Sequence, residues 1–303
     1  MSIPLLFPLE SAAFTRLLCQ QLGAERGEFD KRSFPDGETS LRVTSVVEGR
    51  ACIIVANLTR PDARFLPLCF LATTLRELGA TQVGLVAPYL CYMRQDKRFN
   101  DGEAVTSRIF AELLSTQVDW LVTVDPHLHR YHVLDEIYPI PSRVVHGAPV
   151  LAEYLRGQRD LLLVGPDVES EQWVAGLAAA SGHPFVIGTK VRSGDRAVEV
   201  QLPDLARFKG RSAVIVDDVV ASGYTLLQCF RVLRAAGFTE IDCACVHGLF
   251  AEHSDRMLLD NGIRRLITTN TLPHPSNNVD VTPAVTRAVT ELLAATPTRP
   301  RAT

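Results

Sequence analysis

Residues 212–225 read SAVIVDDVVASGYT, and this stretch decides the fold. The apolar, β-branched run 213–216 predicts a buried strand that delivers Asp217 and Asp218 to its end. The Ser-Gly pair that follows predicts a tight turn, and a helix is expected to open at about Thr225. A strand, a short turn and a helix in this order form the basic unit of an α/β fold.

The same stretch predicts a ligand site, because ligands of open parallel sheets bind beyond the carboxyl ends of the strands. Backbone N–H groups of the turn and of the helix start would converge on one point, which suits a phosphate group. The hydroxyls of Ser222 and Thr225 add donors, and the two carboxylates suit vicinal hydroxyls or a metal ion. Together these features predict a phosphorylated pentose as the ligand. The alternative is an acidic loop with an ordinary helix cap.

Short β-branched runs alternate with helical patterns on both sides of this stretch. Strands that are separated by helices at this spacing imply βαβ units and mostly parallel sheets. The pattern runs through twice, which predicts two tandem α/β domains, residues 1–145 and residues 146–303. The predicted strands cover residues 51–56, 83–87, 120–124, 161–164, 185–188, 213–216, 241–246 and 266–268, and the predicted helices cover residues 64–78, 104–115, 171–180 and 226–236.

Composition argues against several classes of function. A formal net charge of -3 provides no electrostatic footprint for non-specific nucleic-acid binding. Neither GxxxxGK[ST] nor GxGxxG occurs, which argues against ordinary P-loop and dinucleotide sites. The sequence has no apolar run of about 18 residues, so no membrane span is expected, and its first residues lack the pattern of a signal peptide. The 7 scattered cysteines predict reduced thiols. We therefore expect a cytoplasmic protein without membrane or nucleic-acid partners.

Several short motifs, in their order and spacing, resemble those of the ribose-phosphate pyrophosphokinases. Residues 212–225 are similar to the loop with which type I phosphoribosyltransferases bind ribose 5-phosphate. The resemblance runs from about Phe34 to Pro273, and it implies two phosphoribosyltransferase-like domains. The motifs are Phe34-Pro-Asp-Gly-Glu38, Pro88-Tyr-Leu-Cys-Tyr-Met-Arg-Gln-Asp96, Asp125-Pro-His127, Gly165-Pro-Asp167, Val216-Asp-Asp218 with Ser222-Gly223, His247-Gly-Leu-Phe250 and Thr269-Asn-Thr-Leu-Pro273.

The resemblance implies an activity and its partners. The 1-hydroxyl of ribose 5-phosphate would attack the β-phosphorus of ATP, so that 5-phosphoribosyl 1-pyrophosphate forms and AMP leaves. Mg²⁺ is the implied cofactor. In the family a neighbouring subunit supplies the adenine-binding loop, so a homodimer is the smallest assembly expected.

The resemblance also implies an ATP site in the N-terminal half. An aromatic face can stack on a base, carboxylates can accept from its amino group, and an arginine fork can hold a triphosphate. By composition alone, FPDGE would be an ordinary turn, and the basic stretch after it a solvated loop. The residues that match the adenine loop are Phe34, Asp36 and Glu38, and those that match the second ATP-binding segment are Arg94, Gln95, Asp96 and Lys97.

His127 and Asp167 match the family's metal-binding residues. Mg²⁺ prefers oxygen ligands, so the partner of His127 could be a metal-bound water or a phosphate. Lys190 and Arg192 lie between two predicted strands and match a hairpin that carries the family's catalytic cations. There they would stabilise the charge that develops on the polyphosphate. By composition alone they are surface charges.

The pentose loop matches the family with departures. The family commonly has an acid at the position of Ala221 and a glycine at that of Tyr224. After Asp167 it often has two glycines, where this chain carries Glu169 and Glu171. The residues that match the pentose site are Asp217, Asp218, Ser222, Gly223, Tyr224 and Thr225.

Two other functions stay open at this point. Ala221 favours a phosphoribosyltransferase that consumes phosphoribosyl pyrophosphate with a base. The second alternative is a catalytically silent homologue that binds nucleotide or pairs with an active synthase.

The segment 99–106, FNDGEAVT, contains two acids and no base, so it lacks the basic run of the regulatory site in the common bacterial class.

Overall fold

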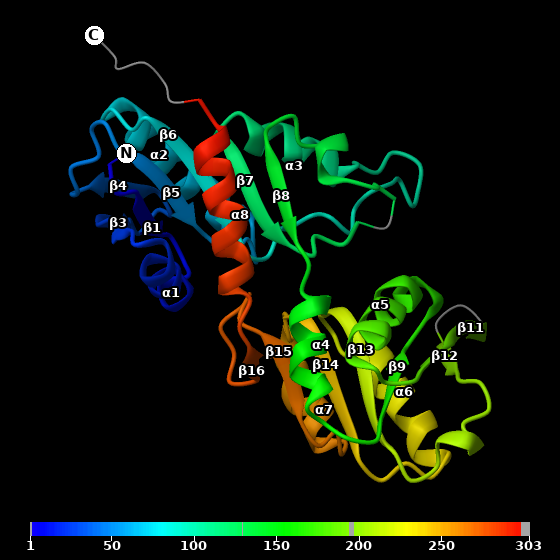
Figure 1. The fold of residues 1–303 in the computed structure, drawn as a ribbon. Coiled ribbons are helices and arrows are strands. Elements are labelled where there is room, and N and C mark those ends of the chain that lie inside the picture. The colour runs from blue at the N-terminus through cyan, green and yellow to red at the C-terminus, as the bar shows by residue number, and fades with distance from the viewer. Residues whose placement is uncertain (1, 129, 194–196, 298–303) are drawn as a thin grey trace. The chain divides into compact units, whose positions relative to one another are not determined.

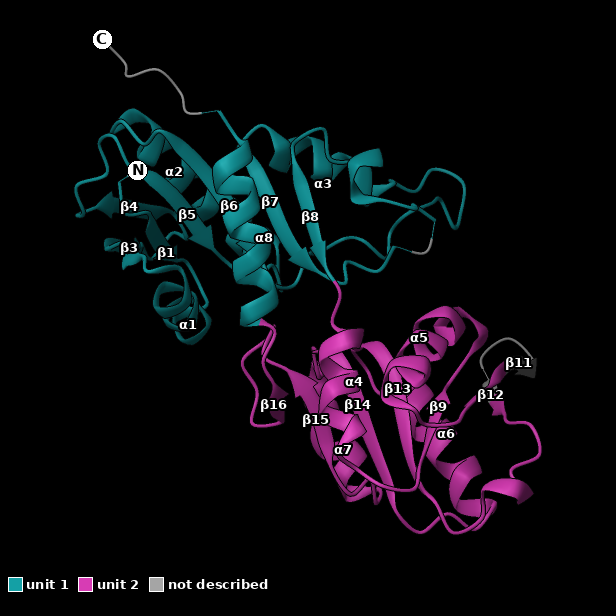
Figure 2. Cartoon of the chain, viewed as in Figure 1, with its two compact units in different colours: residues 1–145, 282–303 teal, residues 146–281 magenta. Residues whose placement is uncertain are grey.

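The computed structural model describes residues 2–128, 130–193 and 197–297, and the side chains of residues 190–199 lie outside the described set. Helices and strands alternate along most of the chain (Figure 1). They form two compact units, one of residues 1–145 with 282–303 and one of residues 146–281 (Figure 2). Each unit has its own hydrophobic core.

The first unit is built on a six-stranded sheet in which every neighbouring pair is parallel. Helices α1 (Ala12–Leu22) and α8 (Thr282–Ala295) pack on one face, and α2 (Asp62–Glu77) and α3 (Thr106–Ser115) on the other (Figure 1). An antiparallel hairpin of β3 (Phe29–Ser33) and β4 (Thr39–Val43) projects from this unit. In spatial order the sheet strands are β2 (Glu25–Arg26), β1 (Leu5–Pro8), β5 (Ala51–Val55), β6 (Gln82–Ala87), β7 (Trp120–Val124) and β8 (Ser142–Val145).

The second unit repeats this plan with another parallel six-stranded sheet. Helices α4 (Ala148–Arg156) and α5 (Glu171–Ser181) cover one face, and α6 (Tyr224–Ala235) and α7 (Ser254–Asp260) the other. A hairpin of β11 (Thr189–Ser193) and β12 (Ala197–Gln201) is antiparallel. In spatial order the sheet strands are β10 (Phe185–Ile187), β9 (Leu161–Gly165), β13 (Ser212–Val220), β14 (Ile241–Gly248), β15 (Leu266–Thr269) and β16 (Asn277–Val279).

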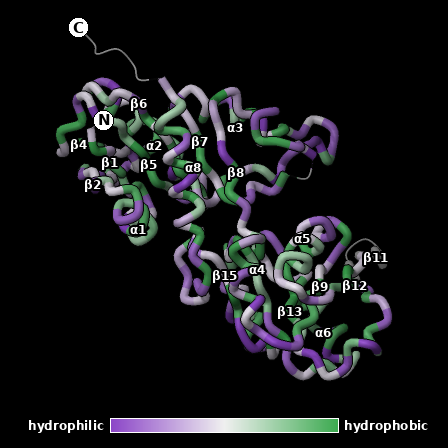
Figure 3. Tube along the Cα trace, viewed as in Figure 1, coloured by the Kyte–Doolittle hydropathy of each residue, from purple (hydrophilic) through white to green (hydrophobic). Residues whose placement is uncertain are grey.

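The predicted fold class is confirmed, since both units are α/β with parallel sheets flanked by helices. Hydrophobic residues concentrate along the central strands (Figure 3), because a sheet covered on both faces buries alternate side chains on both sides. All the predicted strands and helices are present. The alternation did not predict β1, α1, β2, the β3–β4 hairpin, β8, α4, β11, β16, α7 or α8.

The division at residues 145 and 146 corresponds to the predicted boundary, but the C-terminal end does not follow it. Helix α8 lies with the first unit, whereas the sequence placed all of residues 146–303 in the second. The helix buries Val285, Val289 and Leu292, and it contacts β7 and β8. The side chain of Gln21 on α1 donates to the hydroxyl of Thr282 at 2.9 Å. A single domain boundary does not describe the chain, because an amphipathic helix packs against whichever apolar face is uncovered, wherever the helix lies in the sequence.

A buried carboxylate stabilises the amino end of β14. The side chain of Asp242 is 1% exposed, and Arg264 donates to both of its oxygens at 2.8 Å. Arg265 donates to the same carboxylate at 2.6 Å. Burial by itself would raise the pKa of Asp242, but the hydrogen bonds from the two arginines outweigh it and lower the pKa below its usual value.

Asp242→Ala is expected to lower the free energy of unfolding at neutral pH by about 2–3 kcal/mol, less than for a fully buried pair because both arginines reach solvent. Because the pKa is lower in the folded state, this stabilisation is present above the unfolded value of 3.8 and is lost as pH falls through the folded value. Urea unfolding at pH 7 and at pH 3 tests this, with the exposed Asp260→Ala as control. An equal difference from wild type at both pH values would contradict it.

Candidate active site

The two predicted carboxylates lie within β13 and not after it. The strand continues to Val220, and Asp217 pairs in register with Cys245 of β14. The sequence ended the strand at residue 216 because two aspartates are poor strand formers. The parallel partner extends the hydrogen-bonded ladder past them, so Asp217 and Asp218 sit in fixed backbone near the carboxyl end of the sheet.

These carboxylates belong to a cluster of like charge. Burial, followed by the charges of Asp218 and Asp167, raises the pKa of Asp217 well above its usual value. Asp167 comes from the end of β9, the strand next to β13 in the sheet. The mutual repulsion of these carboxylates disfavours their full ionisation, and a nearby positive charge would offset it.

Asp167 also caps the short helical turn that follows β9. Its side chain accepts from the backbone N–H of Ser170 at 3.1 Å. The residues after it, Glu169 and Glu171, are exposed and lie in the first turns of that helical segment, where acids suit the helix dipole.

The turn after β13 leads directly into helix α6 (Tyr224–Ala235). Gly223 has φ 73°, a left-handed conformation that glycine adopts without strain, and helix α6 opens at Tyr224. Ser222 and Tyr224 are exposed, and Thr225 is half-buried. The first N–H groups of a helix have no partner within it, so a ligand site at Thr225 and its neighbours stays a prediction that this geometry permits.

Lys190 and Arg192 lie on strand β11 and not on a loop between strands. Their backbone pairs in register with Val200 and Val198 of β12, and both side chains lie outside the described residues. The sequence analysis placed them between two predicted strands, whereas in the structure they belong to a strand themselves.

In the first unit, Phe34, Asp36 and Glu38 form the tip of the β3–β4 hairpin. The N–H of Phe34 donates to the carbonyl of Glu38 at 2.8 Å, and the N–H of Glu38 donates to the Asp36 carboxylate at 3.1 Å. The guanidinium of Arg32 lies 4.5 Å from the centre of the Phe34 ring. Asp36 therefore shapes the turn, and Glu38 is exposed at its edge.

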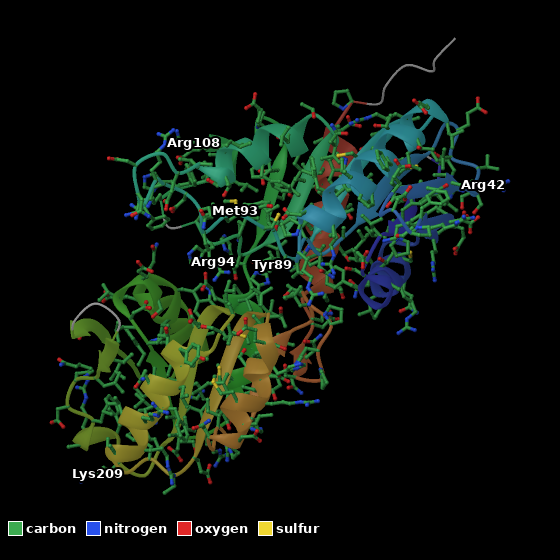
Figure 4. The ribbon with its side chains drawn as sticks, turned by 180° about the vertical axis from the view of Figure 1, so that it is seen from behind. Arg42, Tyr89, Met93, Arg94, Arg108 and Lys209 are labelled. Carbon is green, nitrogen blue, oxygen red and sulfur yellow. The ribbon has the colours of Figure 1, made fainter. Side chains whose placement is uncertain are left out.

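Arg94, Gln95, Asp96 and Lys97 lie on the loop that follows β6. Figure 4 shows Arg94 on this loop with Tyr89 and Met93. Arg94 and Lys97 are exposed, whereas the Asp96 side chain is 8% exposed and accepts from Arg130 at 3.3 Å. The ion pair ties the loop to the segment after β7, and the cations are left at the surface.

His127 follows β7 on a strained stretch of backbone. Both Asp125 and His127 have positive φ, at 30° and 56°, which few residues other than glycine adopt. Such strain persists where the surrounding fold determines the conformation, often at functional sites. Within the described ranges, no three His, Cys, Asp or Glu side chains gather closely enough to hold a metal ion by themselves.

Two family models match the chain. Residues 5–117 match the N-terminal domain of ribose phosphate pyrophosphokinase, and residues 133–285 match the phosphoribosyl transferase domain. The ribose-phosphate pyrophosphokinase of Methanopyrus kandleri is 32% identical over 286 residues, which cover 93% of this chain and 97% of that relative. The chain belongs to the ribose-phosphate pyrophosphokinase family.

Other members of the pyrophosphokinase family are similarly related. That of Methanothermobacter thermautotrophicus is 31% identical over 84% of this chain and 89% of its own length. A crystal structure of phosphoribosylpyrophosphate synthetase from Mycobacterium smegmatis matches with a TM-score of 0.85, at 22% identity, over 97% of this chain and 99% of that one. At this identity the match shows the fold, which agrees with that of the family.

In this pyrophosphokinase, the structure brings together Asp167, Asp217 and Asp218 in the second unit. The hairpin tip, the Arg94 loop and His127 belong to the first unit. Sequence reasoning missed Arg130, which pairs with Asp96. Its place three residues after His127 was a usable signal, because that stretch ends a strand at the ligand-binding edge of a sheet.

Proposed function

We propose that this chain transfers the pyrophosphoryl group of ATP to O1 of ribose 5-phosphate. The observation that carries the proposal is the carboxylate pair of β13 beside the open turn at Gly223, in a member of this family. Asp217 and Asp218 would hold the ribose hydroxyls, and the N–H groups and hydroxyls from Ser222 to Thr225 would hold the 5-phosphate.

The reaction is a displacement at the β-phosphorus. The 1-hydroxyl oxygen forms a bond to that phosphorus, the bond to the oxygen bridging the α- and β-phosphates breaks, and AMP leaves. The hydroxyl proton passes to solvent. No general base is required for this, because phosphoryl transfer depends mainly on positioning and electrostatics. Lys190 and Arg192 would neutralise charge on the transferring and leaving groups.

Phe34, Asp36 and Glu38 would receive adenine, and the segment 94–97 the triphosphate. The exposed cations Arg94 and Lys97 suit an anionic chain, and Arg32 is a further cation beside the Phe34 ring. Since the resemblance implies that a neighbouring subunit supplies the adenine loop, we propose a homodimer or larger homo-oligomer.

We also propose that the protein is cytoplasmic. All seven cysteines are free thiols, which suits the reducing cytoplasm. Among the described helices, none has both the length and the apolar character to cross a membrane.

The residues fit Mg²⁺ as the cofactor. Burial, followed by the charges of Asp218 and Asp167, raises the pKa of Asp217, and a cation near this cluster would offset that effect. Mg²⁺ usually binds through one or two carboxylates together with substrate phosphates and water, so a full protein cage is not needed. By the resemblance, Asp167 would supply a carboxylate oxygen to the ion, and the role of His127 would be to bind a metal-bound water or a phosphate. When bound, the ion would supply positive charge to the phosphate oxygens.

The test is incubation with Mg²⁺, ribose 5-phosphate and ATP labelled at either the α- or the γ-phosphate. We expect γ-label in phosphoribosyl pyrophosphate and α-label in AMP, in equal amounts. Formation of ADP would contradict pyrophosphoryl transfer. Consumption of phosphoribosyl pyrophosphate with a base would show a phosphoribosyltransferase, and binding without turnover a silent homologue.

Inorganic phosphate is expected not to be an essential activator, and ADP to inhibit only by competition with ATP. The Glu103 carboxylate accepts from the N–H groups of Phe99 and Asn100 at 2.8 and 3.0 Å. Hydrogen bonds from Asn100 and Phe99 lower the pKa of Glu103, so it stays charged and repels an anion. Rates in phosphate-free buffer and ADP inhibition at several ATP concentrations test this. Strict dependence on phosphate, or inhibition that saturating ATP leaves unrelieved, would reveal a separate anion site.

A further inference from the structure

The end of β13 is held by backbone donors from the segment that follows β14. The carbonyl of Val220 accepts from the N–H groups of Leu249 and Phe250, each at 3.0 Å. In a trans peptide the carbonyl and the N–H of the next residue point in opposite directions. The N–H of Ala221 is therefore directed away from the segment 249–254.

The next peptide unit is held in the same way by a side chain. The carbonyl of Ala221 accepts from the N–H of Ala251 at 3.0 Å and from the hydroxyl of Ser254 at 2.7 Å. Ser254 is 4% exposed, so water does not compete readily for this bond. The N–H of Ser222 consequently points away from α7, and no described hydrogen bond uses it. Two successive N–H groups directed to one side form an anion-binding arrangement.

The segment that makes these bonds adopts unusual backbone. Phe250, Glu252 and His253 have φ of 43°, 54° and 62°, although none is glycine. Each such conformation costs on the order of 1 kcal/mol and persists only where the surroundings determine it. The bonds to Val220 and Ala221 are part of those surroundings.

Helix α7 also packs against Gly223, the residue that follows Ser222 in the turn. A side chain at Gly223 would meet Met257 and Leu258 at 3.2 Å, so these residues already fill the space behind it. Ser254 begins the same helix. The carbonyl of Ala221 and the α-carbon of Gly223 thus rest on one short helix, while Ser222 between them is exposed.

We propose that Ser254 is a positioning residue for the 5-phosphate of ribose 5-phosphate, which it orients through the Ala221–Ser222 peptide. This inference rests on the proposed function, because it concerns the same pentose site. The hydroxyl fixes the carbonyl of Ala221, and the N–H of Ser222 is thereby aligned before the ligand arrives. Preorganised donors of this kind reduce the cost of binding.

The experiment compares Ser254→Ala with Ser181→Ala in the full-length protein. Ser181 is a matched control, since its buried hydroxyl also donates to a backbone carbonyl, that of Leu177 at 2.8 Å, on α5. Ser254→Ala is expected to raise KM for ribose 5-phosphate by about fivefold to tenfold, with kcat and KM for ATP unchanged. Calorimetric titration of ribose 5-phosphate should show the same loss, and Ser254→Thr, which keeps the hydroxyl, should recover the affinity.

An unchanged KM for ribose 5-phosphate, or an equal loss with Ser181→Ala, would overturn the proposal. So would a rise in both KM values, because that indicates a general structural effect. If Ser254→Ala does not fold, Ser254→Cys, with its weaker donor, is read in the same way. Wild type that neither binds ribose 5-phosphate nor forms product would instead overturn the proposed function.

Discussion

Lys190→Ala is expected to lower kcat by about 10²–10³-fold, the usual cost of removing one preorganised charge contact from a transition state. The fold should be unaffected, because the backbone of β11 pairs with β12 through residues at every position of the strand. KM for both substrates should change less than kcat, since the charge that Lys190 would stabilise develops during transfer. Steady-state assays with each substrate varied in turn measure this separation.

Lys209→Ala serves as the control for Lys190→Ala. Lys209 is an exposed lysine of the same unit, on the turn before β13, and is labelled in Figure 4. Its removal changes the net charge equally without touching the hairpin. A kcat within about twofold of wild type for Lys190→Ala would remove the residue from the mechanism. Recovery of part of kcat in Lys190→Arg would indicate that positive charge is what the position supplies.

Asp218→Asn is expected to lower kcat/KM for ribose 5-phosphate by about 10–100-fold, as for the loss of hydrogen bonds to a charged group. The amide keeps the shape and can still accept from the N–H of Val219, which now donates to the carboxylate at 2.7 Å. It loses the charge that would hold the ribose hydroxyls or metal. ATP binding should change far less, because the proposed adenine and triphosphate residues lie in the first unit.

Separate titrations of ATP and ribose 5-phosphate test this assignment, with Asp260→Asn as the control. Asp260 is an exposed acid at the end of α7. If ATP affinity collapsed in Asp218→Asn while ribose 5-phosphate affinity stayed at the wild-type value, the two sites would be the reverse of our proposal.

Local patterns predicted those parts of the fold that depend on neighbouring residues. The run 120–124 is β-branched and apolar, and β7 has those bounds. The turn after β13 was predicted because Ser222 and Gly223 have strong conformational preferences of their own. The hairpin tip at Asp36 is likewise a local turn, since its side chain bonds a backbone group two residues on.

Patterns failed where a distant partner decides the conformation. Asp217 and Asp218 have low strand propensity, yet β14 extends the ladder beside them. Lys190 and Arg192 look like loop residues, but β12 pairs with them. Propensity is a weak preference of about 1 kcal/mol, which pairing and packing override.

The sequence by itself determined the α/β class, the family and the tight turn after β13, because these depend on residue types and their spacing along the chain. The tertiary structure alone decided that α8 returns to the first unit, that burial with the charges of Asp218 and Asp167 raises the pKa of Asp217, and that Ser254 donates to the carbonyl of Ala221. Ser254 and Ala221 are separated by 33 residues in the sequence. Such contacts form only when strands that are distant in sequence become neighbours in a sheet, so no local pattern predicts them.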